Sequence, residues 1–383
     1  MSRIEISGGA VAYQLDGPTS GPVLVLLNSL GTTTNLWEPQ LPSLCRFFRV
    51  LLYDYPGHGD SAPRPGPYSV EGLGDELCAL LDALGIKSAC FCGLSLGGMI
   101  GLSIAARFPE RVVRLVAACT DAKMSPPQYW LDRAARARAE GLSPLREQIL
   151  SRWFSPDFTS SEPALVARFA EQLLKVDPGS YAAACEALAA ADLTDQLASI
   201  SAPTMILAGA LDQATPPRRG LDLQAAIPGA TLRVLSNAAH LANLEQPESF
   251  AGALLGHLTG GQWARGVATR RRVLGDQHVD QALASATAFA SDFQELITRY
   301  AWGEVWARPG LDQFTRRCIT IALLVSLGRW EELEMHVRAA ENDLSPDQIA
   351  EVLLHAAIYC GVPAGNAAFD HAKRVLFPEE PPA

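Results

Sequence analysis

The chain has 383 residues, of which 48% are hydrophobic and 19% are charged, and its formal net charge is −10 at pH 7. This composition excludes an intrinsically disordered chain, and the length suits two globular domains. Residues 1–258 carry 19 basic and 25 acidic side chains, and residues 259–383 carry 12 and 16. Neither part therefore has the basic surplus that nucleic-acid binding needs.

The sequence has no apolar run near the roughly 18–20 residues of a membrane span. Its N-terminus, MSRIEISGGA, lacks the apolar core of a signal peptide. We therefore expect a cytoplasmic protein. The eight cysteines form no Cys-x-x-Cys pair and no zinc-type spacing, so we expect small, mostly buried thiols and no bound metal.

Apolar runs of strand length alternate with helical spacing over the first 258 residues. Near-continuous apolarity indicates strands buried on both faces of a parallel sheet. Helical segments between them, such as 69–84 and 96–108, make the predicted fold class α/β. The predicted strands are 22–30, 48–55, 88–95, 112–119, 203–210 and 231–236.

The sequence GLSLGG, residues 93–98, follows one of these strands directly and precedes a predicted helix. In that context G-x-S-x-G is typical of a nucleophile elbow, a tight strained turn that exposes a serine hydroxyl. We therefore expect Ser95 to be a nucleophile. A serine hydroxyl needs a histidine to take its proton, and that histidine needs a carboxylate to fix its tautomer.

Both partners follow later in the chain. Asp212 comes just after the predicted strand 203–210, and His240 follows the last predicted strand. The order of serine, acid and histidine resembles that of the α/β-hydrolase family, and the resemblance implies a catalytic triad of Ser95, His240 and Asp212. Asp195 is the alternative acid.

The same resemblance implies two further features of the site. The oxyanion hole would use the N–H groups of Leu30 and Leu96. His58, in YPGHGDS, would belong to a structural turn after the strand at 48–55.

Strand patterns are absent between about residues 123 and 195, where the α/β-hydrolase family inserts a helical cap over the site. An arginine that faces inward from a cap suits an anionic substrate, and tryptophans can form a pocket wall. The resemblance thus implies substrate-binding residues, with a solvated helix face or the core of the cap as the alternatives. The candidates are Trp130, Arg133 and Trp153.

The segment LGHLTGGQWARGVATRRRVLG, residues 255–275, marks the join between two domains. We place the first domain at 1–258, the linker at 259–267 and the second domain at 268–383. We interpret the arginine triplet Arg270–Arg272 as a solvated helix start. Only helical patterns follow, so the second domain is predicted to be all-α, with a capping box at Ser345–Gln348. The predicted helices are 280–307, 312–327, 330–342, 346–360 and 364–376.

The strings RYAWGEVWARPGLDQFTRRCITIALLVSLGRWEELEMHVRAA and EVLLHAAIYCGVPAGNAAF closely resemble the carboxymuconolactone decarboxylase family. Its members are small all-helical enzymes of the alkylhydroperoxidase D-like fold, and the resemblance covers roughly residues 265–377. The peroxidase branch of that fold requires a Cys-x-x-Cys pair shortly before a histidine. Arg329 and Glu332 stand at those positions before His336, which disfavours peroxidase chemistry.

In the substrate that this resemblance implies, the departing carboxylate lies on the γ-carbon of an unsaturated lactone. The conjugated lactone takes up the electrons, so no cofactor is expected. The protein must hold a dianion, stabilise the developing oxyanion and protonate the α-carbon. His336 and His355 are the candidate acid and electrophile, with Glu332 in support because it lies one helical turn before His336. The candidate carboxylate ligands are Arg316, Arg317 and Arg329.

The two resemblances support each other, because decarboxylation of 4-carboxymuconolactone yields 3-oxoadipate enol-lactone, which α/β-hydrolase lactonases open. The whole chain resembles the fused, bifunctional enol-lactonase and decarboxylase family of protocatechuate degradation. The alternative is another carboxylesterase or lactonase with a helical oligomerisation domain. Because the decarboxylase family forms oligomers, we also expect a homo-oligomer assembled through the second domain.

Overall fold

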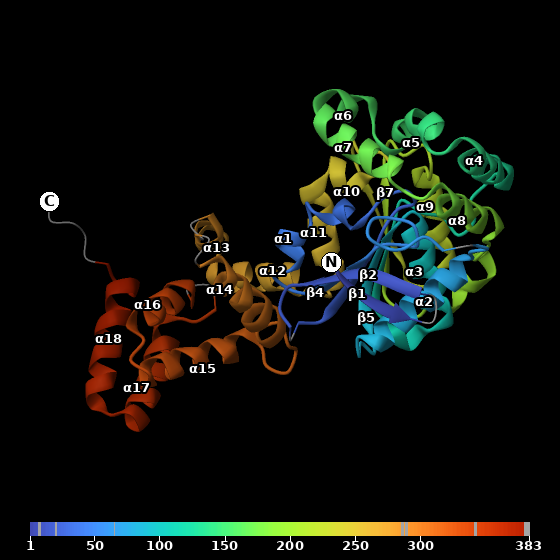
Figure 1. The fold of residues 1–383 in the computed structure, drawn as a ribbon. Helices are drawn as coiled ribbons and strands as arrows, with labels where there is room; N and C mark the ends of the chain where they lie inside the picture. The colour runs from blue at the N-terminus through green and yellow to red at the C-terminus, as the bar shows by residue number, and fades with distance from the viewer. Residues whose placement is uncertain are drawn as a thin grey trace. The chain divides into compact units, whose positions relative to one another are not determined.

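Figure 1 shows the fold in a computed structural model, which describes all residues except 7–8, 20, 65, 285–286, 288–289, 341–342 and 379–383. The chain divides into two units, Met1–Leu258 and Thr259–Ala383. Each unit has its own hydrophobic core, so each is described by itself. No helix among the described residues has the length and apolarity needed to cross a membrane.

An eight-stranded sheet forms the centre of the first unit, in the order β1-β2-β4-β3-β5-β6-β7-β8. The strands from β3 to β8 pair in parallel, which confirms the α/β prediction. β1 and β2 form an antiparallel pair that extends the sheet beyond β4 and was not predicted. The strands are β1 Ser2–Ile6, β2 Gly9–Asp16, β3 Val23–Leu27, β4 Arg49–Tyr53, β5 Ala89–Leu94, β6 Val112–Ala118, β7 Thr204–Gly209 and β8 Thr231–Leu235.

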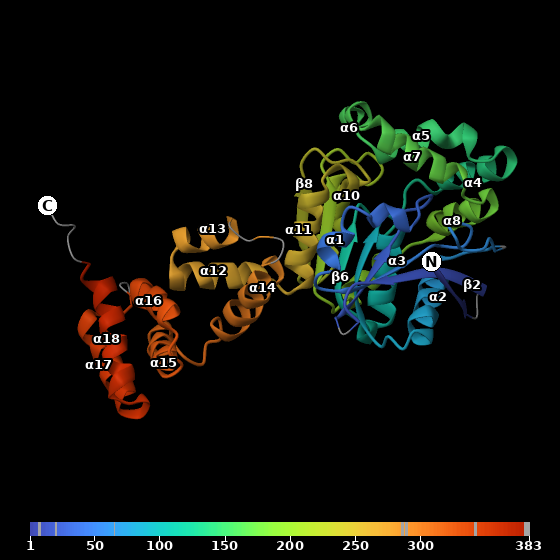
Figure 2. The same cartoon turned by 60° about the vertical axis from the view of Figure 1, so that its left-hand side comes forward.

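Helices cover both faces of this sheet. α2 and α3 pack together on one face and α1 and α11 on the other, as Figure 2 shows. The central strands are consequently buried along their length, as their uninterrupted apolar sequences predicted. The helices of this layer are η1 Thr34–Trp37, α1 Leu41–Leu44, α2 Val70–Ala83, α3 Leu96–Arg107, η2 Pro109–Arg111, η4 Thr194–Ser199, α9 Pro217–Ala226, α10 Ala242–Glu245 and α11 Pro247–Leu258.

Between β6 and β7 the chain forms a group of helices, and those from α4 to α7 lie together beyond one end of the sheet in Figure 1. Proline stands in the first turn of most of them, where its missing N–H costs no helical hydrogen bond. The group comprises α4 Pro127–Glu140, η3 Ser143–Leu145, α5 Arg146–Trp153, α6 Pro156–Ser161, α7 Pro163–Leu174 and α8 Pro178–Ala190.

The described part of the second unit contains helices and no strands. α12 begins at Gln262, so most of the segment expected as a linker at 259–267 is helical. The predicted capping box is present, since Ser345 and Gln348 bond each other's backbone N–H reciprocally. The helices are α12 Gln262–Leu274, α13 Asp276–Ala284, α14 Ser291–Leu296, the π-helical segment η5 Ile297–Val305, α15 Gln313–Ser326, α16 Trp330–Ala339, α17 Pro346–Cys360 and α18 Val362–Leu376.

Candidate active sites

Ser95 lies on the tight turn between β5 and α3. Its φ of 57° and ψ of −115° are rarely adopted by L-residues, so the turn is strained. Two glycines make the turn possible. A Cβ on Gly93 would lie 2.0 Å from the carbonyl oxygen of Gly97, and one on Gly97 would lie 2.4 Å from that of Leu27. Thr120 Oγ1 donates a hydrogen bond of 2.7 Å to the Ser95 carbonyl and supports the strained residue.

A buried hydrogen-bonded pair lies at the same end of the sheet, where His240 Nδ1 is 2.9 Å from Asp212 Oδ2. Asp212 also accepts hydrogen bonds from Ala214 N and from the backbone N–H and hydroxyl of Thr215. Burial favours a higher pKa for Asp212, but His240 and the Thr215 bonds outweigh it and lower the pKa below its usual value. The ionised carboxylate fixes the Nδ1–H tautomer of His240 and leaves Nε2 free to accept a proton. The alternative acid, Asp195, is exposed on η4.

Ser95 and His240 line one small pocket together with the three predicted cap residues. The pocket volume is about 20 Å³, which is room for about one water molecule. The cap therefore closes tightly over the serine in this structure. The lining residues are Ser29, Leu30, Ser95, Trp130, Arg133, Ile149, Arg152, Trp153, Ala214 and His240. Arg152, which directly precedes Trp153, is a second cationic residue of this lining, and its guanidinium lies over the Tyr129 ring.

Arg133 is the predicted cationic group of this pocket, and it is buried rather than solvated. Its guanidinium donates to the hydroxyls of Tyr181 and Tyr129 and lies over the Trp130 and Tyr181 rings, 5.3 Å from each centroid. Among the described residues its Nε has no hydrogen-bond partner, and no carboxylate is paired with it. A permanent positive charge thus borders the pocket without a protein counterion.

The loop that carries Leu30 is held by His58. Gly31 N donates to His58 Nε2 at 3.1 Å, and His58 Nδ1 donates to the Pro56 carbonyl at 3.0 Å. The neutral imidazole of His58 therefore satisfies both ring nitrogens, because one accepts and the other donates a hydrogen bond. Burial lowers the pKa of His58 to about 4. The expectation that His58 serves a structural turn agrees with these contacts.

In the second unit, His336 is buried among aromatic and cationic groups. Its ring stacks on Trp306 with centroids 6.1 Å apart, and Arg317 Nη1 lies 3.4 Å from its Nδ1. Burial first, and then the charges of Arg317 and His278, lower the pKa of His336 to about 4. The imidazole is therefore neutral at neutral pH. With Nδ1 facing a donor, its proton resides on Nε2.

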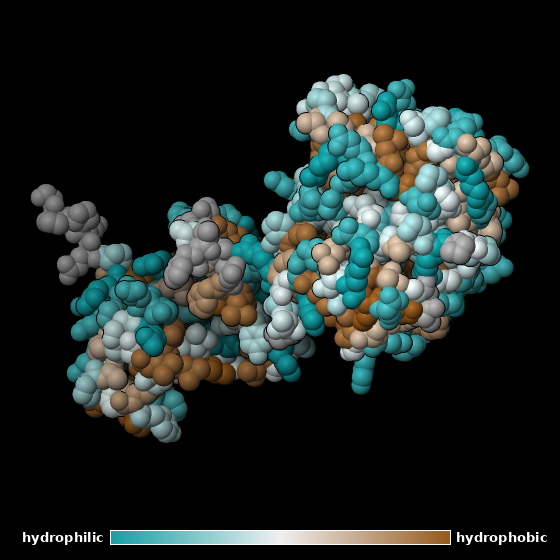
Figure 3. Space-filling view, in the orientation of Figure 1, coloured by the Kyte–Doolittle hydropathy of each residue, from teal (hydrophilic) through white to brown (hydrophobic). Residues whose placement is uncertain are grey.

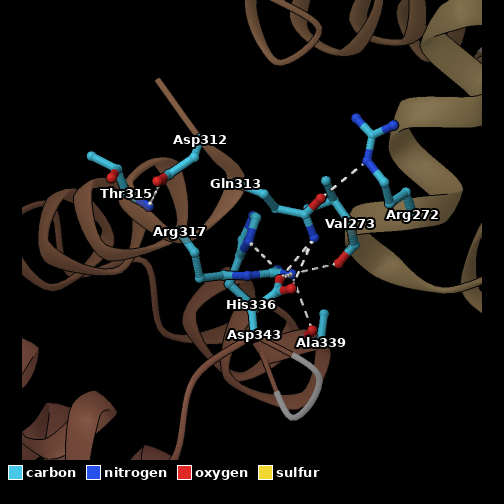
Figure 4. Close-up of polar contacts among 9 residues, drawn as sticks. All are labelled: Arg272, Val273, Asp312, Gln313, Thr315, Arg317, His336, Ala339 and Asp343. Atoms are coloured by element: carbon cyan, nitrogen blue, oxygen red, sulfur yellow. Dashed lines mark hydrogen bonds and ion pairs between the residues drawn. The ribbon is translucent and has the colours of Figure 1, made fainter. Parts of the chain in front are cut away.

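Arg317 is held by several contacts within the second unit. The side chain is fully buried, and its Nη2 is 2.7 Å from the Val273 carbonyl, 3.0 Å from that of Ala339 and 2.8 Å from Asp343 Oδ2 (Figure 4). Its guanidinium thus joins α12, α15 and the end of α16, and its second nitrogen faces His336. All of these contacts are with groups of the protein itself, and the expected contact of Arg317 with substrate stays a prediction.

The other predicted residues of this unit are less buried than His336. Glu332 is exposed on α16, and Arg329 is exposed just before this helix begins. His355 is exposed on α17, where its ring contacts Tyr359. Arg316 lies on α15 and donates to the carbonyl of Arg308. No described contact joins Glu332 or His355 to His336.

The arginine triplet of α12 differs from its interpretation as a solvated helix start. It lies in the second half of the helix, and Arg270 is buried, with only 5% of its surface exposed. Arg271 instead pairs with Asp276 and Asp280 at the surface.

Within the described ranges, no group of three or more His, Cys, Asp or Glu side chains is arranged to hold a metal ion.

The two units match different protein families. Residues 22–247 match the alpha/beta hydrolase fold family, and residues 291–374 match the carboxymuconolactone decarboxylase family. The chain is 40% identical to 3-oxoadipate enol-lactonase 2 of Acinetobacter baylyi over 64% of this chain and 91% of that protein. It is 46% identical to 4-carboxymuconolactone decarboxylase of the same organism over 30% of this chain and 87% of that protein. The solved enol-lactonase from Burkholderia xenovorans LB400 has a TM-score of 0.66 and 38% identity, covering 67% of this chain and 100% of that chain.

We expect the substitution His58→Gln to weaken the pH dependence of unfolding of the first unit. Because the folded pKa of about 4 lies below the ordinary 6.5, the unfolded chain binds the extra proton between these values. The contribution of His58 to the free energy of unfolding is fully present above pH 6.5. It falls by about 3 kcal/mol in total as the pH is lowered toward 4. Denaturant unfolding at several pH values measures the slope, and equal slopes for the two proteins would assign the effect to other groups.

Proposed function

We propose two consecutive reactions from one premise, that the chain belongs to the alpha/beta hydrolase fold family over its first unit and to the carboxymuconolactone decarboxylase family over its second. The second unit decarboxylates 4-carboxymuconolactone to 3-oxoadipate enol-lactone, and the first unit hydrolyses that enol-lactone to 3-oxoadipate. The observation that carries the proposal is the covalent pairing of these units, whose relatives are named for these two compounds. The buried His240–Asp212 pair that shares a pocket with Ser95 supports the hydrolytic step.

In the hydrolytic step, Ser95 attacks the lactone carbonyl while His240 Nε2 takes the serine proton. The imidazolium returns this proton to the enol oxygen as the lactone C–O bond breaks, and the released enol converts to the ketone. Water hydrolyses the resulting acyl-enzyme, with His240 again as the base. Asp212 stabilises the imidazolium that forms in each half of the reaction.

The oxyanion that forms on the lactone carbonyl accepts hydrogen bonds from the N–H groups of Leu30 and Leu96. Leu96 is the first residue of α3, so its N–H has no carbonyl partner within the helix. Leu30 lines the Ser95 pocket, and the bond from Gly31 to His58 supports its loop. Such preorganised donors stabilise charge that develops only in the transition state.

Arg133 binds the side-chain carboxylate of the enol-lactone. The guanidinium is buried at the pocket wall, its Nε is unpaired among the described residues, and no described carboxylate competes for it. A substrate carboxylate would supply the missing counterion and accept a hydrogen bond from the free Nε–H of Arg133. Trp130 and Trp153 enclose the lactone ring.

In the decarboxylation step, the γ-carboxylate leaves as carbon dioxide while His336 donates a hydrogen bond from Nε2–H to the carbonyl oxygen that becomes an enolate. A neutral imidazole serves this purpose, because it stabilises the developing charge without first transferring its proton. Arg317 maintains the tautomer by facing Nδ1. The other candidate, His355, then protonates the α-carbon and gives the enol-lactone. Glu332 and His355, which are exposed in the single chain, contribute at a contact between copies.

A homo-oligomer formed through the second unit would bring these exposed groups into a site. His355 lies on α17 beside Ile358 and Tyr359, which are 76% and 79% exposed. Figure 3 shows further hydrophobic surface over α15, where Leu323 and Leu327 are exposed. We infer that a second copy of this chain covers this apolar face, because a patch of this kind marks an interaction surface.

The central test supplies purified protein with 4-carboxymuconolactone and identifies the end product by mass spectrometry. We expect 3-oxoadipate from the wild type, and we expect the Ser95→Ala variant to accumulate the enol-lactone. The serine variant should lose about 10³-fold or more in lactone hydrolysis, because its nucleophile is gone. Hydrolysis at the native rate by this variant would contradict the assignment of Ser95, and no turnover by the wild type would contradict the whole proposal.

We expect Arg133→Met to raise the KM for the enol-lactone about 10-fold to 100-fold, because one charged hydrogen-bonded contact is lost. The same substitution should change the KM for an uncharged γ-lactone by less than about 3-fold. Arg138→Met is the matched control, since Arg138 lies on the same helix and pairs with Glu186 at the surface. An equal loss on charged and uncharged lactones would argue for a structural role of Arg133 instead.

We expect Ile358→Glu to dissociate the oligomer and to lower decarboxylation while lactone hydrolysis is unchanged. A buried charge on the apolar face would oppose association. Light scattering coupled to size-exclusion chromatography reports the mass of both proteins. A wild-type chain that is monomeric at micromolar concentration would refute the assembly.

A further inference from the structure

The second unit contains a buried cationic group that none of the steps above uses. Arg270 projects from α12, and its Nη1 donates to Gln294 Oε1 at 3.0 Å and to Thr298 Oγ1 at 3.2 Å. Both partners are neutral. Among the described residues no carboxylate pairs with Arg270, and its buried Nε has no acceptor. Gln294 and Thr298 therefore fix the guanidinium while leaving donors and a full charge unmatched.

Arg270 and His336 are each linked to one hydrophobic cluster through a neighbouring residue, Arg270 through Val273 on α12 and His336 through the Trp306 ring. That cluster has Val273, Val279 and Trp302 at its centre, with Trp306 and Met335 packed against it. Arg270 lies one turn before Val273, and its partner Thr298 lies about one turn before Trp302. Trp306 connects Trp302, 5.1 Å away between centroids, with His336, 6.1 Å away.

His278, next to Val279, reaches the same region from α13. Partial burial, followed by the charges of Arg270 and Arg338, lowers the pKa of His278. The charge of His278 in turn acts on His336. Nearby carboxylates among the described residues pair with other arginines. Asp343 is bonded to Arg317, and Asp276 and Asp280 are bonded to Arg271.

Resting on the proposed decarboxylation, we propose that Arg270, with His278 beside it, binds a substrate carboxylate next to His336. The ligand class is a lactone dicarboxylate. Of its two carboxylates, Arg270 holds the one on the methylene side chain, which keeps its charge throughout the reaction. An ion pair to the departing carboxylate would stabilise the ground state and slow the loss of carbon dioxide.

Binding of a carboxylate that does not react contributes equally to the ground state and the transition state. Removing Arg270 should therefore raise the KM for decarboxylation about 10-fold to 100-fold, while kcat changes little. A residue that merely supported the fold would not separate the two constants in this way.

The direct test uses a ligand that binds but cannot react. We choose the saturated γ-lactone that carries a carboxylate and a carboxymethyl group on its γ-carbon, which lacks the double bond needed as electron sink. Its partner probe carries a carbamoylmethyl group instead, so only the side-chain charge differs. All proteins are full-length and carry Ser95→Ala, so that the first unit does not hydrolyse the probes, and calorimetry measures Kd.

Arg271→Met is the matched control, because Arg271 lies on the same helix and already pairs with Asp276 and Asp280. Relative to it, we expect Arg270→Met to bind the dicarboxylate about 10-fold to 100-fold more weakly and the carbamoyl probe equally well. Arg270→Lys covers the case in which the methionine variant does not fold. Since lysine keeps the charge but lacks the planar fork, we expect about a 3-fold to 10-fold loss on the dicarboxylate alone.

The outcomes separate this inference from the proposed function. Equal binding by the Arg270 and Arg271 variants, or an equal loss on both probes, would overturn the Arg270 site even if decarboxylation is observed. If Arg271→Met neither decarboxylates 4-carboxymuconolactone nor binds either probe, the proposed decarboxylation and the Arg270 site both fail.

Discussion

A guanidinium removed from water must satisfy its donors and its charge, and this constraint shapes both units. Arg317 meets the charge requirement within the protein, because it bonds Asp343 and two backbone carbonyls and thereby ties α12, α15 and α16 together, although its Nε has no partner among the described residues. Arg133 and Arg270 meet the constraint only in part, through neutral hydroxyl and amide groups. The contrast supports the proposed binding of anionic ligands by Arg133 and Arg270, since each lacks a described carboxylate partner whereas Arg317 has one.

Several neighbouring elements of the first unit support the strained backbone of Ser95. Ser95 is held by neighbouring strands and by glycines that let α3 approach the sheet. His240 is fixed by Asp212, which is itself fixed by the backbone of the loop after β7. The reactive groups are thus positioned by parallel strands that end at the same edge of the sheet.

The strands from β3 to β8 and the Ser95 turn were predictable, because long apolar runs and G-x-S-x-G depend on local sequence alone. The β1–β2 pair was missed because its residues are half-exposed and lack a strong apolar pattern. Arg270 was misjudged for a related reason. Successive arginines on a helix point in different directions, and only the packing of α12 against η5 decides which one is buried. The roles of Arg317 and Asp343 depend on contacts between separate helices, which no local spacing reveals.

Only residues 259–261 separate α11 from α12, so one polypeptide carries both units. A single translation event then produces the two catalysts in equal number, and the cell cannot tune one against the other by expression. In the proposed reaction sequence, the steady level of the enol-lactone is therefore set by the turnover constants of the two units.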